Sequence, residues 1–351
     1  LSVRVTMDNS TESNQKQLLE LRLKLADTGF FAKKTKAYFS RFVIASTLLV
    51  VAYFYTIQLN SWVLLILASL VLALLSLQVG FVAHDAGHGA TSRKKWVNVA
   101  FGHVCFTIVN GLGFTYWRET HLAHHQNCQD EENDPDMLSD GIISLTAAQA
   151  KKKKGFVQHV LPFQAYYFWF VIVLYPYKLR YQGFEHLCKN FRNSKADLMM
   201  ILHYALWLLL PTLIPGVGFL DTLLVYVLTA SFLGVLLMGV FSVNHLGMPI
   251  IFDGEKLGYF NQQAGLTRNI RNHPIFDFFF GGLNSQIEHH LFPNAPSMNL
   301  RKGRATVKEF CAENDVNYHE ESYFSSLKSV TRHLARIAGL ERENLKNRRV
   351  S

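Results

Sequence analysis

The chain has 351 residues, of which 49% are hydrophobic and 17% charged, and its net charge is +9. This composition is apolar for a soluble protein. No basic stripe interleaves with aromatic residues, which excludes nucleic acid as a partner on these grounds. The first forty residues are polar and charged, unlike a cleavable signal peptide. The composition therefore favours a membrane protein.

Four stretches are long enough to cross the hydrocarbon core of a bilayer, which takes roughly 20 apolar residues. The first contains a single charge, Arg41, and the other three contain none; they are Ser40–Asn60, Trp62–Ala83, Leu198–Leu220 and Thr222–Val243. The short turn within each pair contains no Lys or Arg. We therefore predict an all-α integral membrane protein with four transmembrane helices arranged as two hairpins.

The chain divides into five sections of a single domain. We expect a cytoplasmic N-terminal helix at 1–40, the first hairpin at 41–83, a cytoplasmic and interfacial section at 84–197, the second hairpin at 198–243, and a cytoplasmic C-terminal section at 244–351. Lys and Arg concentrate outside the hairpins, so the positive-inside rule puts both termini in the cytoplasm. The four cysteines have no paired spacing, and we expect free thiols.

Histidines form three clusters with helical spacing. The clusters read "HDAGH" with His84 and His88, "HLAHH" with His121, His124 and His125, and "QIEHH" with Gln286, His289 and His290. A further histidine, His245, lies just past the fourth predicted span. Residues three or four apart share one helix face, so each cluster presents its imidazoles together. Imidazole is the commonest metal ligand, and the clusters predict a metal site.

The number of histidines indicates more than one metal ion. Seven clustered imidazoles, or eight with His245, exceed what one tetrahedral zinc needs. Two metals with about four imidazoles each fit better and leave positions open for dioxygen. The zinc-protease pattern H-E-x-x-H is absent. Asp85 and Glu288 adjoin ligand candidates. They either orient imidazoles or are solvated carboxylates or helix-end charges, and the sequence leaves these interpretations open.

A shared metal site constrains the topology. All three clusters must lie on one side of the membrane, within a helical cytoplasmic cap. Two further apolar stretches, Val97–Trp117 and Phe156–Tyr177, would separate the clusters if either crossed alone. Both are interrupted by polar residues, glycine or proline. We therefore expect both to lie at the interface or under the cap.

At this point the sequence resembles the membrane fatty-acid desaturase family. The resemblance runs from "HDAGHGA" through "WRETHLAHHQNCQDEENDPD" to "TRNIRNHPIFDFFFGGLNSQIEHHLFP". A third box that begins with Gln is similar to that of front-end desaturases, which place a double bond between an existing one and the carboxyl end of an acyl chain. The Δ6 and Δ5 enzymes are familiar members of this branch.

The resemblance implies the ligands and the chemistry. The three boxes correspond to His84, His88, His121, His124, His125, His289 and His290, and an extra ligand corresponds to His245. The implied cofactor is a pair of irons that use O2 as co-substrate, and the implied substrate is a fatty acyl chain carried by a lipid or coenzyme A. Gln286 stands where other branches have histidine. Its amide oxygen is a weaker ligand than imidazole, so it binds one iron loosely, binds through water, or does not bind.

The electron donor is expected to be a separate protein. Many eukaryotic front-end enzymes carry a fused cytochrome b5 domain marked by H-P-G-G, and this motif does not occur here. We therefore expect ferredoxin, or free cytochrome b5 with its reductase. The compact length favours a bacterial inner membrane over the endoplasmic reticulum. Membrane lipids surround the spans. Five basic residues are candidates for binding a phosphate-bearing headgroup or coenzyme A, namely Arg93, Lys94, Lys95, Arg268 and Arg271.

Two alternative functions remain open at this stage. The same scaffold and oxidant serve lipid or hydrocarbon hydroxylases, which return a hydroxyl group to the substrate carbon. A membrane metal transporter would need polar or ionisable residues inside the spans, and His203 is the one clear candidate.

Overall fold

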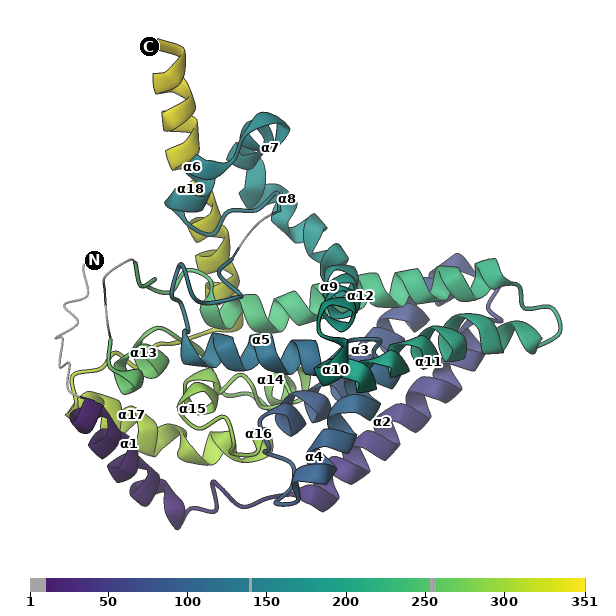
Figure 1. Cartoon of the computed structure of the whole chain (residues 1–351), viewed down its shortest axis with the longest axis horizontal. Coiled ribbons are helices and arrows are strands. Elements are labelled where there is room, and N and C mark those ends of the chain that lie inside the picture. The colour runs from purple at the N-terminus through teal and green to yellow at the C-terminus, as the bar shows by residue number, and fades with distance from the viewer. Residues whose placement is uncertain (1–10, 139–140, 253–254, 256, 351) are drawn as a thin grey trace.

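The computed structural model describes residues 11–138, 141–252, 255 and 257–350, and these residues form a mostly helical fold (Figure 1). The first hairpin consists of α2 (Thr35–Thr56) and α3 (Trp62–Gly87). The second rises through a broken helix and returns in α12 (Phe219–His245). Both hairpin turns lie at the right-hand end in Figure 1, whereas α1 (Thr11–Ala26) and α18 (Tyr323–Val350) lie toward the left. The hairpins therefore run in parallel toward the same end of the molecule.

The first helix of the second hairpin, Phe191–Leu213, is a run of short helical segments. It comprises α10 (Phe191–Ser194), η4 (Lys195–Met199), α11 (Met200–Tyr204), η5 (Ala205–Leu209) and η6 (Leu210–Leu213). The run begins seven residues before the predicted start at Leu198, and it ends before the turn that carries Pro215 and Gly216. Proline and glycine together account for that stop, since neither favours a helix interior.

Within the part of the chain that the structure describes, five helices, and not the predicted four, are long and apolar enough to cross a membrane, apart from one bent pair. They are Thr35–Thr56, Trp62–Gly87, Gly155–Lys189, Phe191–Leu213 and Phe219–His245. The additional one, Gly155–Lys189, contains the stretch that the sequence placed at the interface. The molecule is thus a multi-pass membrane protein with one more candidate span than the sequence predicted.

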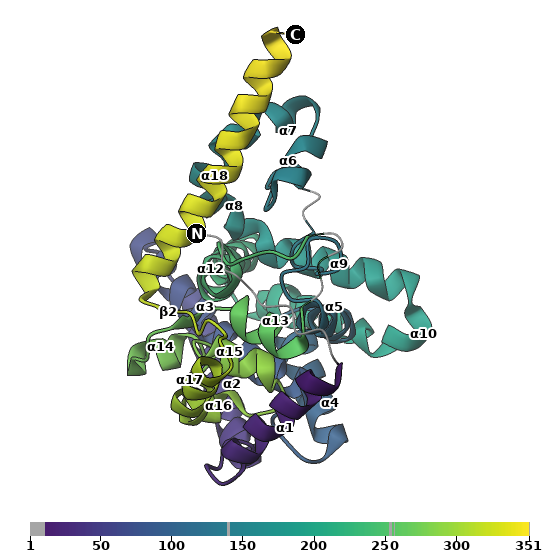
Figure 2. The same cartoon turned by 90° about the vertical axis from the view of Figure 1, so that its left-hand side faces the viewer.

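The additional helix crosses the bundle and does not run alongside it. It consists of α7 (Gly155–Val160), η2 (Leu161–Phe163), α8 (Gln164–Val171), η3 (Ile172–Leu174) and α9 (Tyr175–Lys189). Figures 1 and 2 both show α8 and α9 passing across α12. Gly234 of α12 permits this crossing, because a Cβ there would lie 2.4 Å from the carbonyl oxygen of Ile172. The Tyr177 hydroxyl donates to the Val227 carbonyl at 2.9 Å and holds the two helices together.

The predicted stretch Val97–Trp117 is sharply bent. The helical run Lys95–Val109, made of α4 (Lys95–Gly102) and η1 (His103–Val109), meets α5 (Phe114–Gln126) at 113°. Gly111 lies at the bend with φ +68, a conformation that suits glycine. Gly113 lets Gly183 approach, since a Cβ at Gly113 would lie 3.3 Å from the Gly183 Cα. The segment therefore enters the bundle and turns back, and it does not form a straight span.

The remaining elements build a cap over one end of the hairpins. They are α6 (Ala147–Lys152), α13 (Tyr259–Gly265), β1 (Asn269–Ile270), α14 (Pro274–Phe279), α15 (Gln286–Leu291), α16 (Ser297–Leu300), η7 (Arg301–Gly303), α17 (Arg304–Glu313) and β2 (Glu320–Glu321). Strands β1 and β2 pair in parallel, with Asn269 opposite Glu320. Leu21 and Leu25 of α1 share a core with Phe310 of α17. This packing fixes α15, and with it the third histidine box, against the hairpins.

Candidate metal centre

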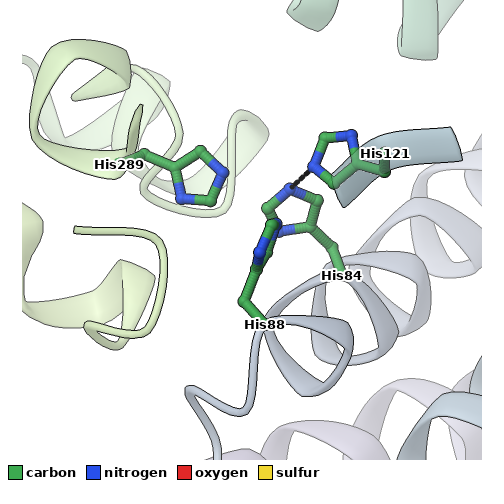
Figure 3. A group of neighbouring side chains, drawn as sticks. All are labelled: His84, His88, His121 and His289. Atoms are coloured by element: carbon green, nitrogen blue, oxygen red, sulfur yellow. Dashed lines mark hydrogen bonds between the residues drawn. The ribbon is translucent and has the colours of Figure 1, made fainter. Parts of the chain in front are cut away.

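The first group of histidines joins three helices. His84 lies in the last turn of α3 and His88 just after it, His121 comes from α5, and His289 comes from α15. One ring nitrogen from each lies within 4.8 Å of the others. Figure 3 shows the four rings converging, with His84 Nε2 3.1 Å from His121 Nε2. This set has the dimensions of a site for one metal ion.

A second group lies beside the first. It brings together His124 of α5, His245 at the end of α12, and His290 of α15, with Cys128 as a fourth member. The ring centroids of His124 and His245 are 4.8 Å apart, and those of His245 and His290 are 4.9 Å apart. The Cys128 thiol is fully buried and lies 3.9 Å from His245 Nδ1. All four cysteines are free thiols, as the sequence predicts.

The eighth histidine connects the two groups. The His125 ring stacks on His290 with centroids 4.2 Å apart, and it lies 4.7 Å from the His289 ring. It also lies 4.6 Å from the His88 ring. The structure thus brings all eight histidines of the prediction into one continuous cluster.

Several ring nitrogens of this cluster have no hydrogen-bond partner, as expected of atoms that bind a metal ion. Buried nitrogens with no hydrogen-bond partner occur on His88, His125, His289 and His290. A buried polar atom without a partner is costly, and a neutral imidazole nitrogen is an acceptor that a metal ion satisfies. Burial is the largest cause that holds the pKa values of His88, His289 and His290 well below the usual value, so these rings are neutral. The residues fit a bound metal pair.

Polar side chains behind the rings fix their orientation. His84 Nδ1 donates to Asp85 at 3.0 Å, and Asp85 also accepts from the Tyr38 hydroxyl and, at 2.9 Å, from the Ser297 backbone. His124 Nδ1 donates to Asp134 at 2.9 Å. Partners of this kind set the tautomer and leave Nε2 for the metal. The contacts of Asp85 therefore match the orienting interpretation of that residue.

His290 has an orienting partner that sequence reasoning missed. Its Nδ1 donates to Gln263 Oε1 at 2.8 Å. Gln263 comes from α13, far from any histidine box, and no local pattern marks it. Asp134, in contrast, belongs to the turn "NDPD" just after the second box, and a carboxylate ten residues from His124 was a readable signal.

Glu288 does not orient an imidazole, and that interpretation of the sequence is wrong. Its carboxyl accepts from Asn269 Nδ2 at 2.9 Å and from the Tyr318 hydroxyl at 2.8 Å. Residues one or two apart in a helix do not face each other, so Glu288 does not share the direction of the rings that follow it. Burial is the largest cause that raises its pKa. Glu288 is 0% exposed, so it is not a solvated carboxylate. It lies in the first turn of α15, which matches the remaining interpretation, a charge at a helix end.

Gln286 lies at the edge of the second group. Its Nε2 is 2.9 Å from His245 Nε2, and its Oε1 accepts from Asn244 Nδ2 at 3.2 Å. The side chain is buried. The glutamine of the third box therefore contacts a member of the histidine cluster directly.

Two residues that the sequence offered for binding other molecules, Arg268 and His203, already have partners inside the protein. Arg268 is unavailable to a headgroup, because it is 1% exposed and donates to the Val243 and Leu246 carbonyls. His203 does not present a free ligand nitrogen to a transported cation. Its Nδ1 pairs with the Ile108 carbonyl and its Nε2 with the Tyr226 hydroxyl.

The fold and the cluster together define a class: membrane proteins with histidine groups that could hold metal ions, contributed by the ends of apolar helices and by a cap. The model of the fatty acid desaturase family matches residues 60–322, most of the chain. The chain belongs to the fatty acid desaturase family, and it is an oxidoreductase. The family prediction made from the sequence is confirmed.

Curated relatives extend the match over nearly the whole chain. A Delta(8)-fatty-acid desaturase of Euglena gracilis is 27% identical, and the alignment covers 92% of this chain and 79% of the length of that relative. An acyl-lipid (9-3)-desaturase of Borago officinalis is 26% identical and covers 96% and 78%. A Delta(6)-fatty-acid desaturase of Caenorhabditis elegans is 26% identical and covers 95% and 80%.

Proposed function

We propose that this fatty acid desaturase is a front-end enzyme that introduces a cis double bond on the carboxyl side of an existing one. The observation that carries the proposal is the Gln-headed third box, whose Gln286 lies against His245 inside the histidine cluster. The names of the relatives, which include Delta(6) and Delta(8) desaturases, support the same branch.

Two irons are the proposed cofactor. The first would be held by His84, His88, His121 and His289, and the second by His124, His245 and His290. His125 lies between the two groups, so its ring could bind the metal ion of the first group or that of the second. When bound, the iron pair supplies the reduction of O2 and the removal of hydrogen from an unactivated methylene, which no side chain can perform.

The chain itself contributes orientation and exclusion of water. Asp85, Asp134 and Gln263 hold three of the imidazoles in one tautomer through their Nδ1 atoms. The Trp117 ring stacks on His121 with centroids 4.5 Å apart and covers that ligand. Because the cluster is buried by these neighbours, the reacting carbon and oxidant are kept from bulk water.

Gln286 is proposed to tune the second group. Its contact with His245 leaves the amide either hydrogen-bonded to that ring or turned as a weak oxygen ligand. Either arrangement makes the second metal position more weakly ligated than a histidine would. The weakly ligated position is where the carboxyl-proximal part of the substrate would approach.

The topology proposed is four crossings in one domain of residues 1–351, with both ends and the cap in the cytoplasm. The bend of 113° between Lys95–Val109 and Phe114–Gln126 supports a re-entrant segment. The crossing of α8 and α9 over α12 in Figure 2 supports an interfacial place for Gly155–Lys189. A tag inserted near Lys151 should be inaccessible from outside the cell; accessibility there would contradict this topology.

The proposed substrate is a fatty acyl chain on a lipid or coenzyme A, with electrons from a ferredoxin or a cytochrome b5. The 351 residues contain no H-P-G-G motif, so the electrons would reach the metals from outside these residues. The basic composition and the apolar helices support contact with membrane lipids.

The test is expression in a host that lacks polyunsaturated lipids, fed with linoleate, with gas chromatography and mass spectrometry of the acyl chains. A new double bond on the carboxyl side of the existing pair is the expected product. Hydroxylated acyl chains would instead identify a hydroxylase. No product in the presence of both candidate donors and restored iron would contradict desaturation.

Two variants refine that assay. His124→Ala should give no product while the protein still inserts in the membrane at wild-type level. Gln286→His should lower activity or shift the position of the new bond. Full activity with unchanged position would remove Gln286 from the tuning role.

A further inference from the structure

A second polar cluster lies between the two hairpins, away from the histidines. A small, partly open cavity of about 30 Å³ lies there, lined among others by Tyr53 of α2, Ser76 of α3, Arg180 of α9, Trp207 of η5 and Thr229 of α12. Ser76 precedes His84 by eight residues of the same helix, which places it about 12 Å away along the axis. A volume of this size holds one or two water-sized groups.

The cavity contains a buried positive charge. Arg180 is 6% exposed. Its Nε and Nη2 donate to the Asn110 carbonyl at 3.2 and 3.0 Å, while its Nη1 is buried and has no partner. Among the described residues no carboxylate pairs with it, although a guanidinium keeps its charge throughout the physiological range.

Part of that charge is compensated by the fold. The Asn110 carbonyl follows the C-terminal end of the helical run Lys95–Val109, where the helix dipole is negative. The guanidinium carbon also lies 5.0 Å from the centre of the Tyr226 ring, within reach of a cation–π interaction. Neither contact uses Nη1, so one donor and part of the charge remain for the cavity.

The other unpartnered atoms of the lining are donors as well. Trp207 Nε1 and Thr229 Oγ1 are both buried without partners. The remaining polar groups are already satisfied: the Tyr53 hydroxyl donates to the Trp207 carbonyl, and both ring nitrogens of His203 are paired. An indole N–H and a guanidinium N–H can only donate. The cavity therefore calls for an acceptor.

We propose that the Arg180 cavity binds a small monoanion, either a halide from solvent or the carboxylate of a free fatty acid. A cation is disfavoured by the guanidinium, and the volume excludes a phosphate-bearing headgroup. An unpaired buried charge is costly, and one negative charge facing three donors removes that cost. This site is separate from the metal centre, and it does not depend on which double bond the enzyme makes.

The first experiment measures thermal unfolding of the purified full-length protein in detergent, with chloride or bromide replacing gluconate at constant ionic strength. A saturable rise of Tm is expected because the anion binds the native state. In crystals grown with bromide, an anomalous peak should lie within hydrogen-bond distance of Arg180 Nη1. Arg180→Met should remove both signals, and Arg336→Met, which removes an exposed arginine of α18, should retain them.

A milder variant guards against simple misfolding of Arg180→Met. Thr229→Val keeps the shape and removes one donor, so the apparent affinity for bromide should fall about tenfold. Oleate, compared with methyl oleate as a neutral control, separates the two sources: displacement of bromide by oleate alone identifies a fatty-acid carboxylate, and no displacement identifies a halide site. Equal Tm in all anions with no effect of oleate, or an unchanged anion response in Arg180→Met, would overturn the proposal.

Discussion

The histidine centre and the Arg180 cavity are both buried polar clusters, but their unpartnered atoms have opposite character. In the histidine centre the free atoms are imidazole nitrogens of neutral rings on His88, His125, His289 and His290. In the cavity they are donors on Arg180, Trp207 and Thr229. Acceptors left unpaired call for a metal cation, whereas donors beside a fixed positive charge call for an anion. The chemistry of the free atoms, more than polarity alone, separates the two clusters.

The largest expected effect follows from removing one ligand of the histidine centre. His290→Ala deletes an imidazole whose Nε2 is unpartnered and whose Nδ1 donates to Gln263. Activity should fall by more than about 100-fold, beyond the loss typical of an orienting residue. Bound iron, measured by mass spectrometry of the purified protein, should fall in parallel.

The same variant tests whether the two clusters are independent. His290→Ala should keep the halide-dependent rise of Tm, because the Arg180 cavity lies deeper in the hairpins. His159→Ala is the matched control, since His159 is an exposed residue of α7 outside the cluster. Loss of the halide response in His290→Ala alone would show that the clusters are coupled and would break the comparison.

The two clusters also differ in how far the sequence predicts them. Seven of the histidines occur in short boxes with helical spacing, and this local pattern predicts them as ligand candidates. The eighth, His245, stands alone and was predicted from its place after an apolar span and from the family resemblance. The hairpins were equally readable, because uncharged runs of about 20 residues are rare outside membranes. The bend after Val109 was foreshadowed by Asn110, Gly111 and Gly113.

The cavity had no such pattern. It takes single residues from separate elements, and only the packing of α9 against α12 brings Arg180 to Thr229. The same reason explains Gln263, which reaches His290 through the fold of the cap. It also explains Glu288: its position next to His289 suggested contact, but neighbours in a helix face different directions. The spacing of residues in the sequence predicts which side chains share one face of a helix. Tertiary packing determines which residues that face contacts.

A smaller effect is expected from an orienting carboxylate of the histidine centre. Asp134→Asn keeps the shape but weakens the charge-assisted bond to His124 Nδ1, now 2.9 Å long. Activity or iron affinity should fall about 10–100-fold. Glu132→Gln is the matched control: it removes an exposed carboxylate of the same loop that does not pair with His124, so less than about threefold loss is expected. Equal losses in both variants would contradict the orienting role of Asp134.

Acidification should destabilise the metal-free protein through the histidine centre. The pKa values of His88, His289 and His290 are held well below 6.5, chiefly by burial. Below pH 6.5 the histidines of the unfolded chain bind protons, whereas the buried rings of the native protein do not. The contribution of these rings to the free energy of unfolding is therefore complete above pH 6.5 and is lost as the pH falls. Each of the three neutral rings adds to this dependence of stability on pH. Thermal unfolding of metal-free protein should show a lower Tm at pH 5.5 than at pH 7.5.

Two observations would sharpen that result. Glu288 acts in the opposite direction, because burial raises its pKa above 4.5 and its contribution declines as the pH rises. A Tm that increases on acidification would therefore mean that Glu288 outweighs the histidines. The anion response should persist at both pH values, because none of the histidines of the metal centre lines the Arg180 cavity.

The smallest effect is expected at the bend that carries the Arg180 cavity. Gly111→Ala places a Cβ 2.5 Å from the His203 ring at a φ of +68, so native stability should fall by about 2 kcal/mol. The backbone shift that this Cβ causes lies next to Asn110, whose carbonyl accepts a hydrogen bond from Arg180. The halide-dependent rise of Tm should therefore weaken, while the amount of bound iron stays unchanged. Gly339→Ala, a helix position with no atom within 4 Å of its Cβ, is the control and should be neutral or slightly stabilising. If iron were lost from Gly111→Ala and the halide response kept, the bend would serve the histidine centre through α5, and the separation of the two clusters would have to be abandoned.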